Sequence, residues 1–219
     1  MKIFVMGSCR VQSSLRTYKR LYYNSVDLVL FPPLLHTIEQ HLVALGEKKY
    51  EEFKRYDDIF DLRWGSADFH QITKDNRFGN KLKTEDADIF VIEICGVKYY
   101  TNQKGYILHS FPRFYKTEKY STKYSDRIED KLDMLNYFIG EKPLVIVSNH
   151  NVYEKESRRR LILKLEAFDR YHDNVKLWNP TELIKEEGVK SCLKDVNHFT
   201  EKMKKLQAEN ILRLCKELI

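Results

Sequence analysis

The chain has 219 residues, of which 42% are hydrophobic and 32% charged, and its 38 Lys and Arg against 32 Asp and Glu give a formal net charge of +6. This length fits one domain with its own core, and the supply of aromatic and aliphatic residues excludes a disordered chain. No stretch reaches the roughly 20 apolar residues of a membrane span. The positive charge suits an anionic ligand or simple solubility, and on charge alone we favour solubility.

Apolar runs and helical periodicities alternate along the chain. We expect strands at 2–6, 26–31 (stopped by Pro32-Pro33), 58–62, 89–95, 143–147 and 175–178. Helices are expected from about 11 to 22, then at 34–45, 125–139, 154–171, after Pro180 and at 200–218. This alternation predicts a single α/β domain spanning residues 1–219, a three-layer α/β/α sandwich with a flavodoxin-like parallel sheet of about five strands.

The start of the chain and its cysteine pattern indicate a cytoplasmic protein. Residues 1–7 form too short an apolar run for a signal peptide and contain no small-residue cleavage site. The four cysteines are widely spaced and form no CxxC pair, which fits neither a zinc site nor a disulfide framework: Cys9, Cys95, Cys192 and Cys215. The histidines show no metal-ligand spacing either, so no metal is expected.

Residues 97–124 break the alternation. They are rich in Tyr, Lys, Thr and Ser without a clear period, and we expect an insertion or lid here. Aromatic rings interleaved with cations suit a sugar ring, an adenine ring or single-stranded nucleic acid. A lid packed on the sheet is an equally good interpretation, and nucleic acid is the weakest of these partners.

Ligands of such sheets bind at the carboxyl ends of the strands, so the loops that follow the strands are the first candidates for a site. The first expected strand leads into Gly7-Ser8-Cys9-Arg10, where a glycine allows a tight turn. Cys9 then enters the start of a helix, whose free N–H groups and positive end favour a thiolate. A small buried cysteine is the alternative interpretation, and from this loop alone we favour it.

A second candidate precedes the last expected helix, in Asp195-Val196-Asn197-His198. A carboxylate three residues from an imidazole can hold it in one tautomer, which leaves the other ring nitrogen free to act as a base. A helix cap beside a surface histidine is the alternative, because this spacing is common. Glu93 also stands out, since a carboxylate in an apolar strand needs a partner. We expect that partner to be Arg63, Lys98 or a backbone donor.

The Gly-Ser-Cys turn after the first strand and the late Asp-x-x-His together resemble the first and last blocks of the SGNH (GDSL-like) hydrolase superfamily. On that resemblance, Cys9 stands at the position of the nucleophilic serine, and Asp195 and His198 complete a catalytic triad. Gly-Ser-Cys-Arg is also similar to the Gly-Asn-Cys-Gln turn of the WcbI-type polysaccharide biosynthesis proteins and to the Gly-Ser-Cys start of the GSCFA family. This second resemblance implies acyl transfer in glycan assembly, with coenzyme A or an acyl-coenzyme A as the donor.

The middle blocks of the superfamily match less well. The resemblance implies oxyanion donors at the backbone of Cys9 and of Gly65, with Gly96 at the third block. Lys98 stands where the family has its asparagine, so that donor is missing or replaced, by Lys98 or by Asn149. The residues expected to contact substrate are Ser8, Arg10, Arg63, Lys98 and His150.

The function expected from the resemblance is acyl or ester chemistry on a carbohydrate or glycan, as an O-acyltransferase or esterase with a Cys-His-Asp triad. The alternative is a catalytically inactive binding module for a sugar, nucleotide or nucleic acid, which the missing asparagine and the Tyr/Lys-rich insertion favour. The acyl group, the acceptor and the oligomeric state do not follow from the sequence.

Overall fold

The computed structural model describes residues 1–22, 26–45, 87–102 and 120–219. Its centre is a parallel sheet with the strand order β2-β1-β3-β6-β7. The strands are β1 (Lys2–Gly7), β2 (Asp27–Leu34), β3 (Ile89–Ile94), β6 (Leu144–Ser148) and β7 (Val175–Trp178). This is the predicted flavodoxin-like order, in which β2 is added on one side of β1 and all later strands of the sheet are added on its other side.

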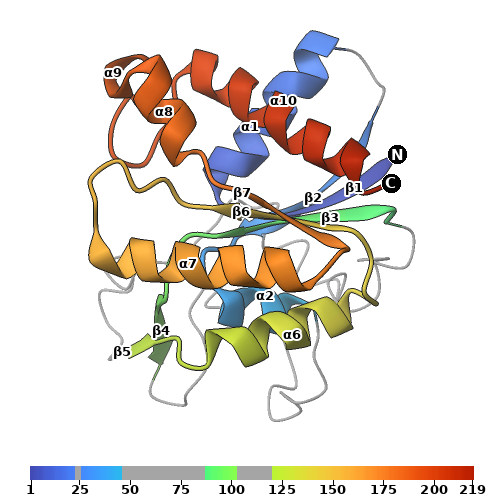
Figure 1. The fold of residues 1–219 in the computed structure, drawn as a ribbon, viewed down its shortest axis with the longest axis vertical. Coiled ribbons are helices and arrows are strands. Elements are labelled where there is room, and N and C mark those ends of the chain that lie inside the picture. The colour runs from blue at the N-terminus through green and yellow to red at the C-terminus, as the bar shows by residue number, and fades with distance from the viewer. Residues whose placement is uncertain (23–25, 46–86, 103–119) are drawn as a thin grey trace.

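Helices cover both faces of the sheet, as Figure 1 shows. One face packs against α2 (Ile38–Ala44), α6 (Ile128–Phe138) and α7 (Glu156–Tyr171). The other packs against α1 (Cys9–Tyr22) and α10 (Glu201–Glu217). Successive residues of a strand point to opposite faces, so Phe4 enters the first core and Val5 the second. Burial on both faces explains why these strands are continuous apolar runs.

A third, smaller core fixes the loop that precedes α10. It joins α8 (Thr181–Glu187) and α9 (Val189–Cys192) to Phe199 and Met203. Leu193 forms a bridge with Phe199, and the Lys194 N–H donates to His198 O at 2.9 Å. Residues 193–199 are therefore closed into a turn that is anchored at both ends.

The expected end of the second strand is wrong. This strand does not stop at Pro32-Pro33, because β2 continues to Leu34. β2 is an edge strand and its register against β1 shifts between Val5 and Gly7, and edges and bulges are where a sheet accepts residues without an N–H. The region 97–124 also has regular structure at its two ends: β4 (Lys98–Asn102) and β5 (Tyr120–Tyr124) form an antiparallel pair.

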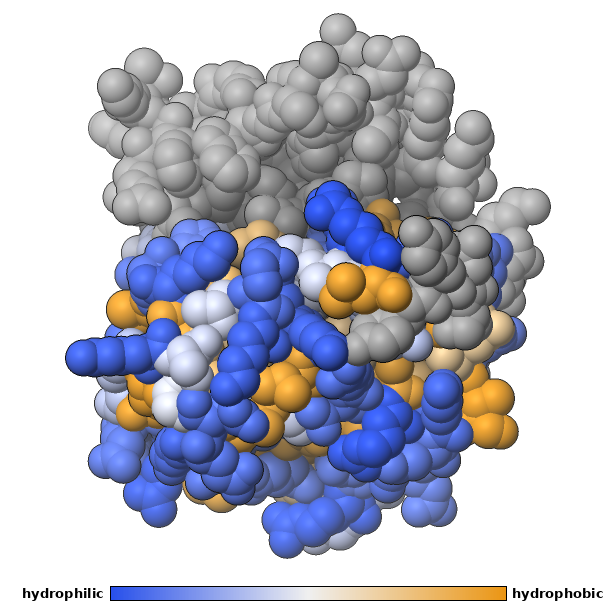
Figure 2. Space-filling view, turned by 90° about the horizontal axis from the view of Figure 1, so that it is seen from above, coloured by the Kyte–Doolittle hydropathy of each residue, from blue (hydrophilic) through white to orange (hydrophobic). Residues whose placement is uncertain are grey.

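The expected strand at 58–62, together with Arg63 and Gly65, lies outside the described residues. None of the described helices has the length and hydropathy needed to cross a membrane. On the face shown in Figure 2, hydrophobic residues are scattered among hydrophilic ones.

Candidate functional site

The turn between β1 and α1 places Cys9 at the carboxyl edge of the sheet. Cys9 is the first residue of α1 and is exposed. Ser8, directly before it, caps the helix, because its Oγ accepts a hydrogen bond from the Arg10 N–H at 3.2 Å. Among the described residues, no side chain makes a hydrogen bond with Cys9 Sγ. The thiol therefore faces solvent from a helix start whose position is fixed.

Glu93 and Arg10 form a buried ion pair directly beneath this turn. Arg10 Nη2 lies 3.2 Å from Glu93 Oε1, and the two side chains are 8% and 2% exposed. The other carboxylate oxygen accepts the Ser8 N–H at 2.7 Å. The expected backbone donor is thus present, but the cation is Arg10, which the sequence placed only among the substrate contacts. Ser8 and Arg10 are both buried, with these polar groups bonded to the protein itself.

Gly7 is required by this ion pair rather than by its backbone angles. A Cβ built at Gly7 would lie 2.7 Å from Glu93 Cβ, closer than real carbon atoms approach. The positive φ angles among the described glycines are those of Gly140 and Gly188. The expectation that Gly7 supplies an unusual turn conformation is therefore wrong, and its lack of a side chain is what lets β1 and the Glu93 side chain meet.

Arg10 also ties together the loops after β3 and β6. Its Nη1 donates to Asn149 Oδ1 at 2.5 Å, and its Nη2 lies 3.1 Å from Cys95 Sγ. Asn149 Nδ2 makes only a long hydrogen bond of 3.5 Å to Cys95 O, so this amide keeps donor capacity. Lys98 is exposed, with its Nζ 5.1 Å from the centre of the Tyr100 ring. Of the two expected replacements for the asparagine, Asn149 belongs to the hydrogen-bond network around Arg10.

The electrostatic surroundings of Cys9 oppose each other. Partial burial and the Glu93 carboxylate raise the pKa of the Cys9 thiol, while Arg10 and the backbone N–H groups of the helix start lower it. The net effect is a raised pKa. The helix start does favour the thiolate, as expected, but this effect is smaller than the opposing effects of burial and Glu93. Cys9 therefore needs a base, or a change in its surroundings, to become a strong nucleophile.

Asp195 and His198 form a local pair before α10. Asp195 Oδ2 lies 2.7 Å from His198 Nδ1, and Oδ1 accepts the backbone N–H groups of Asn197 at 2.7 Å and His198 at 3.0 Å. These backbone bonds, together with the imidazole, lower the pKa of Asp195. An ionised Asp195 fixes the proton of His198 on Nδ1, which leaves Nε2 as an exposed lone pair without a hydrogen bond in the described residues.

The Asp195–His198 loop and Cys9 lie at the same edge of the sheet, because Cys9 follows the carboxyl end of β1 and the loop contacts His150, which follows the carboxyl end of β6. Gln207 Nε2 of α10 donates to Ser14 Oγ of α1 at 3.4 Å, so the two helices contact each other on this face of the sheet. His150 Nε2 lies 3.2 Å from Val196 O, which connects the same loop to the end of β6. No hydrogen bond joins Cys9 to His198 within the described residues.

Two buried histidines next to this network are held neutral. Burial lowers the pKa of His41 to about 4, and its Nε2 donates to Glu93 O at 2.7 Å. Burial and the charge of Arg10 lower the pKa of His150 to about 4. Within the part of the chain that the structure describes, His150 Nδ1 is buried without a hydrogen-bond partner, and the His150 carbonyl accepts from Arg158 at 3.0 Å. Arg158, whose own pKa is lowered by burial and by Arg10, has no carboxylate partner among the described residues.

Comparisons of the chain with models of protein families, with curated proteins and with solved structures found no match. Within the described residues, no group of three or more His, Cys, Asp or Glu side chains could hold a metal ion. The chemical interpretation therefore depends on the geometry of the carboxyl edge. His41 and Arg158 were missed by sequence reasoning, because His41 contacts Glu93 from a distant part of the chain and Arg158 stands in a basic run that is typical of a solvated helix face.

Proposed function

We propose that the protein transfers or hydrolyses acyl groups on a carbohydrate, with Cys9 as nucleophile, His198 as base and Asp195 as the group that orients His198. The observation that supports this most strongly is the pair of exposed, complementary groups at one edge of the sheet. Cys9 presents a thiol from a helix start, and His198 presents an Nε2 lone pair that Asp195 has fixed. Catalytic hydrogen bonds are often long or absent before substrate binds and form only in the complex with substrate.

The first half of the reaction forms a thioester. His198 Nε2 removes the proton of Cys9, the sulfur attacks the acyl carbonyl, and the leaving group departs with that proton. The Cys9 N–H makes no hydrogen bond to another residue in the described part of the chain, so it is available to the oxyanion. Asn149 Nδ2 and the backbone N–H groups of Gly65 and Gly96 are the further candidates for this role.

The second half transfers the acyl group to an acceptor. A sugar hydroxyl gives O-acylation, and water gives deacylation; each regenerates the Cys9 thiol. With acyl-coenzyme A as donor, one thioester is exchanged for another, which is close to even in free energy and favours transfer. The Arg158 guanidinium, which has no carboxylate partner in the described residues and feels the charge of Arg10, suits the phosphate groups of such a donor.

The second candidate is a binding module of the same fold without turnover. The raised pKa of Cys9 favours it, because a thiol that stays protonated is a poor nucleophile. On this alternative, Arg158 at the carboxyl edge of the sheet and the Tyr-rich strands β4 and β5 bind a sugar or nucleotide that is released unchanged.

Intact-protein mass spectrometry after incubation with acetyl-coenzyme A distinguishes the enzyme with a catalytic triad from the binding module. The triad predicts one acetyl group on Cys9 that is lost when an acceptor sugar is added, and Cys9→Ala should abolish both steps with the fold intact. His198→Gln should slow acylation, while His172→Gln, at the opposite edge of the sheet, should leave its rate unchanged. Acetylation at an unchanged rate in Cys9→Ala would exclude the mechanism, and a bound donor without acetylation would support the binding module.

A further inference from the structure

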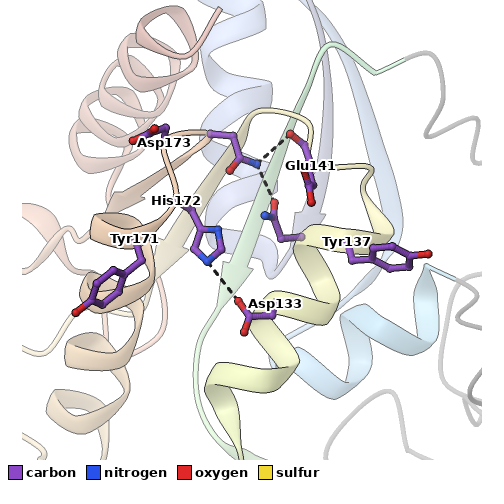
Figure 3. Close-up of a pocket in the computed structure, with 8 residues that line it drawn as sticks. Asp133, Tyr137, Glu141, Tyr171, His172 and Asp173 are labelled. Carbon is purple, nitrogen blue, oxygen red and sulfur yellow. Dashed lines mark hydrogen bonds and ion pairs between the residues drawn. The ribbon is translucent and has the colours of Figure 1, made fainter.

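A pocket of about 430 Å³ opens at the edge of the sheet opposite to Cys9, where α6 and α7 end (Figure 3). Its residues lie just before the first residues of β6 and β7, whereas Cys9 follows the last residue of β1. The volume falls in the range of roughly 300–1,000 Å³ that is typical of small-molecule sites. The pocket is therefore separate from the proposed catalytic edge.

Two asparagines fix the polar character of this pocket. Asn174 Nδ2 donates to Asn136 Oδ1 at 2.8 Å and to Glu141 O at 3.0 Å, which sets the orientation of both amides. Asn136 Nδ2 and Asn174 Oδ1 are then left without a hydrogen-bond partner in the described part of the chain. Asn136 is only 6% exposed and lines the pocket, so a largely buried side chain offers this donor to the pocket. A hydroxyl group can accept from Asn136 and donate to Asn174.

Carboxylates supply further acceptors around this pair. Asp133 Oδ1 lies 3.3 Å from His172 Nε2, and Figure 3 shows the two side chains pointing toward each other across the space between α6 and α7. Glu141 and Asp173 also line the pocket, and its described lining residues include no Lys or Arg. An anionic ligand would be repelled by this set, whereas hydroxyl groups donate well to carboxylates.

Two exposed tyrosines form the rim. Tyr137 and Tyr171 are 73% and 84% exposed, and in Figure 3 their rings lie on opposite sides of the pocket and point outward. The rings therefore border the opening without closing it. From the paired donor and acceptor and the carboxylates, we propose that the pocket binds a neutral sugar residue.

The test uses the ¹⁵N-labelled full chain, because the side-chain amides of Asn136 and Asn174 report directly on the pocket. The probes are methyl α-glucoside, methyl α-mannoside, methyl α-galactoside and N-acetylglucosamine, with spermidine as a cationic comparison. At least one sugar should shift both amide signals in a saturable way. Saturation by spermidine without saturation by any of the four sugars would overturn the proposal in favour of a cation site, and no saturable shift with any probe would overturn it as well.

Matched variants then test the chemistry. Asp133→Asn removes a charged acceptor at a side chain that is 63% exposed, so the fold should persist, and sugar binding should weaken about tenfold. Asn136→Asp keeps the acceptor for Asn174 but removes the free donor, so it should also weaken sugar binding. The control is Asp130→Asn, one turn earlier on α6 and outside this pocket, which should bind sugar as the wild type does. Equal affinity in the Asp133 and Asp130 variants would overturn the proposal.

The proposal does not depend on the proposed function. Cys9→Ala should bind the sugar unchanged, so loss of acylation with retained binding would contradict only the catalytic triad. Retained acylation without sugar binding would contradict only this pocket.

Discussion

Replacing Glu93 by Gln tests the buried ion pair that supports the Cys9 turn. The substitution keeps the shape of the side chain and an oxygen that can accept the Ser8 N–H, but it removes the charge that faces Arg10. Because Arg10 is buried, its guanidinium is left without a compensating carboxylate. Breaking a buried pair by removing one partner costs about 3–5 kcal/mol of unfolding free energy.

We expect the lower end of that range, about 3 kcal/mol, because Arg10 keeps its hydrogen bonds to Asn149 and Cys95. For a chain of this size, that loss corresponds to a decrease in Tm of about 6–12 °C. The same substitution should make the Cys9 thiol more reactive, although it destabilises the fold. The Glu93 carboxylate raises the pKa of the thiol, so its removal lowers that pKa and increases the thiolate fraction at a given pH.

Urea unfolding followed by circular dichroism measures the first effect, and the pH dependence of iodoacetamide alkylation at Cys9 measures the second. The control is Glu156→Gln, which breaks the pair with Arg160 on the surface of α7, where the side chains are 60% and 74% exposed. That change should cost about 0–1 kcal/mol. If the Glu93 variant unfolds like this control and alkylates at the wild-type rate at every pH, the buried pair does not have the role described here.

Two further predictions concern residues that contact Glu93. Gly7→Ala forces a Cβ against Glu93 and should cost about 1–3 kcal/mol in urea unfolding, whereas Gly96→Ala, with no atom within 4 Å of its Cβ, should cost far less; equal costs would contradict the close approach. His41 is neutral in the fold because burial lowers its pKa to about 4, while the unfolded chain takes up a proton below about pH 6.5. The contribution of His41 to stability is therefore complete above pH 6.5 and is lost as the pH falls toward 4, with a loss of about 2 kcal/mol at pH 5. His41→Gln should reduce the decrease in unfolding free energy between pH 7 and pH 5 by that amount, and an unchanged decrease would contradict this.

Much of the sheet can be predicted from the sequence because parallel strands are buried on both faces. Their apolar runs need no alternation to be recognised, and β3, β6 and β7 were expected within one residue of their observed bounds. β2 was expected to end early, because the sequence does not show that it lies at the edge, where prolines are accepted.

Part of the candidate site is local and could be read in the same way. Asp195 and His198 are three residues apart, so their hydrogen bond depends on one turn of chain. The position of Cys9 likewise follows from the succession of a strand and a helix.

The sequence by itself determined the layers, the loops at the carboxyl edge and the short-range Asp195–His198 pair, since these depend on periodicity and on neighbours along the chain. Only the tertiary structure decided that Arg10 pairs with Glu93, that Gly7 must lack a side chain, and that Asn136 meets Asn174. Each of these contacts joins residues from different elements, and residue type alone does not show which distant groups the packing of strands and helices brings within hydrogen-bond distance.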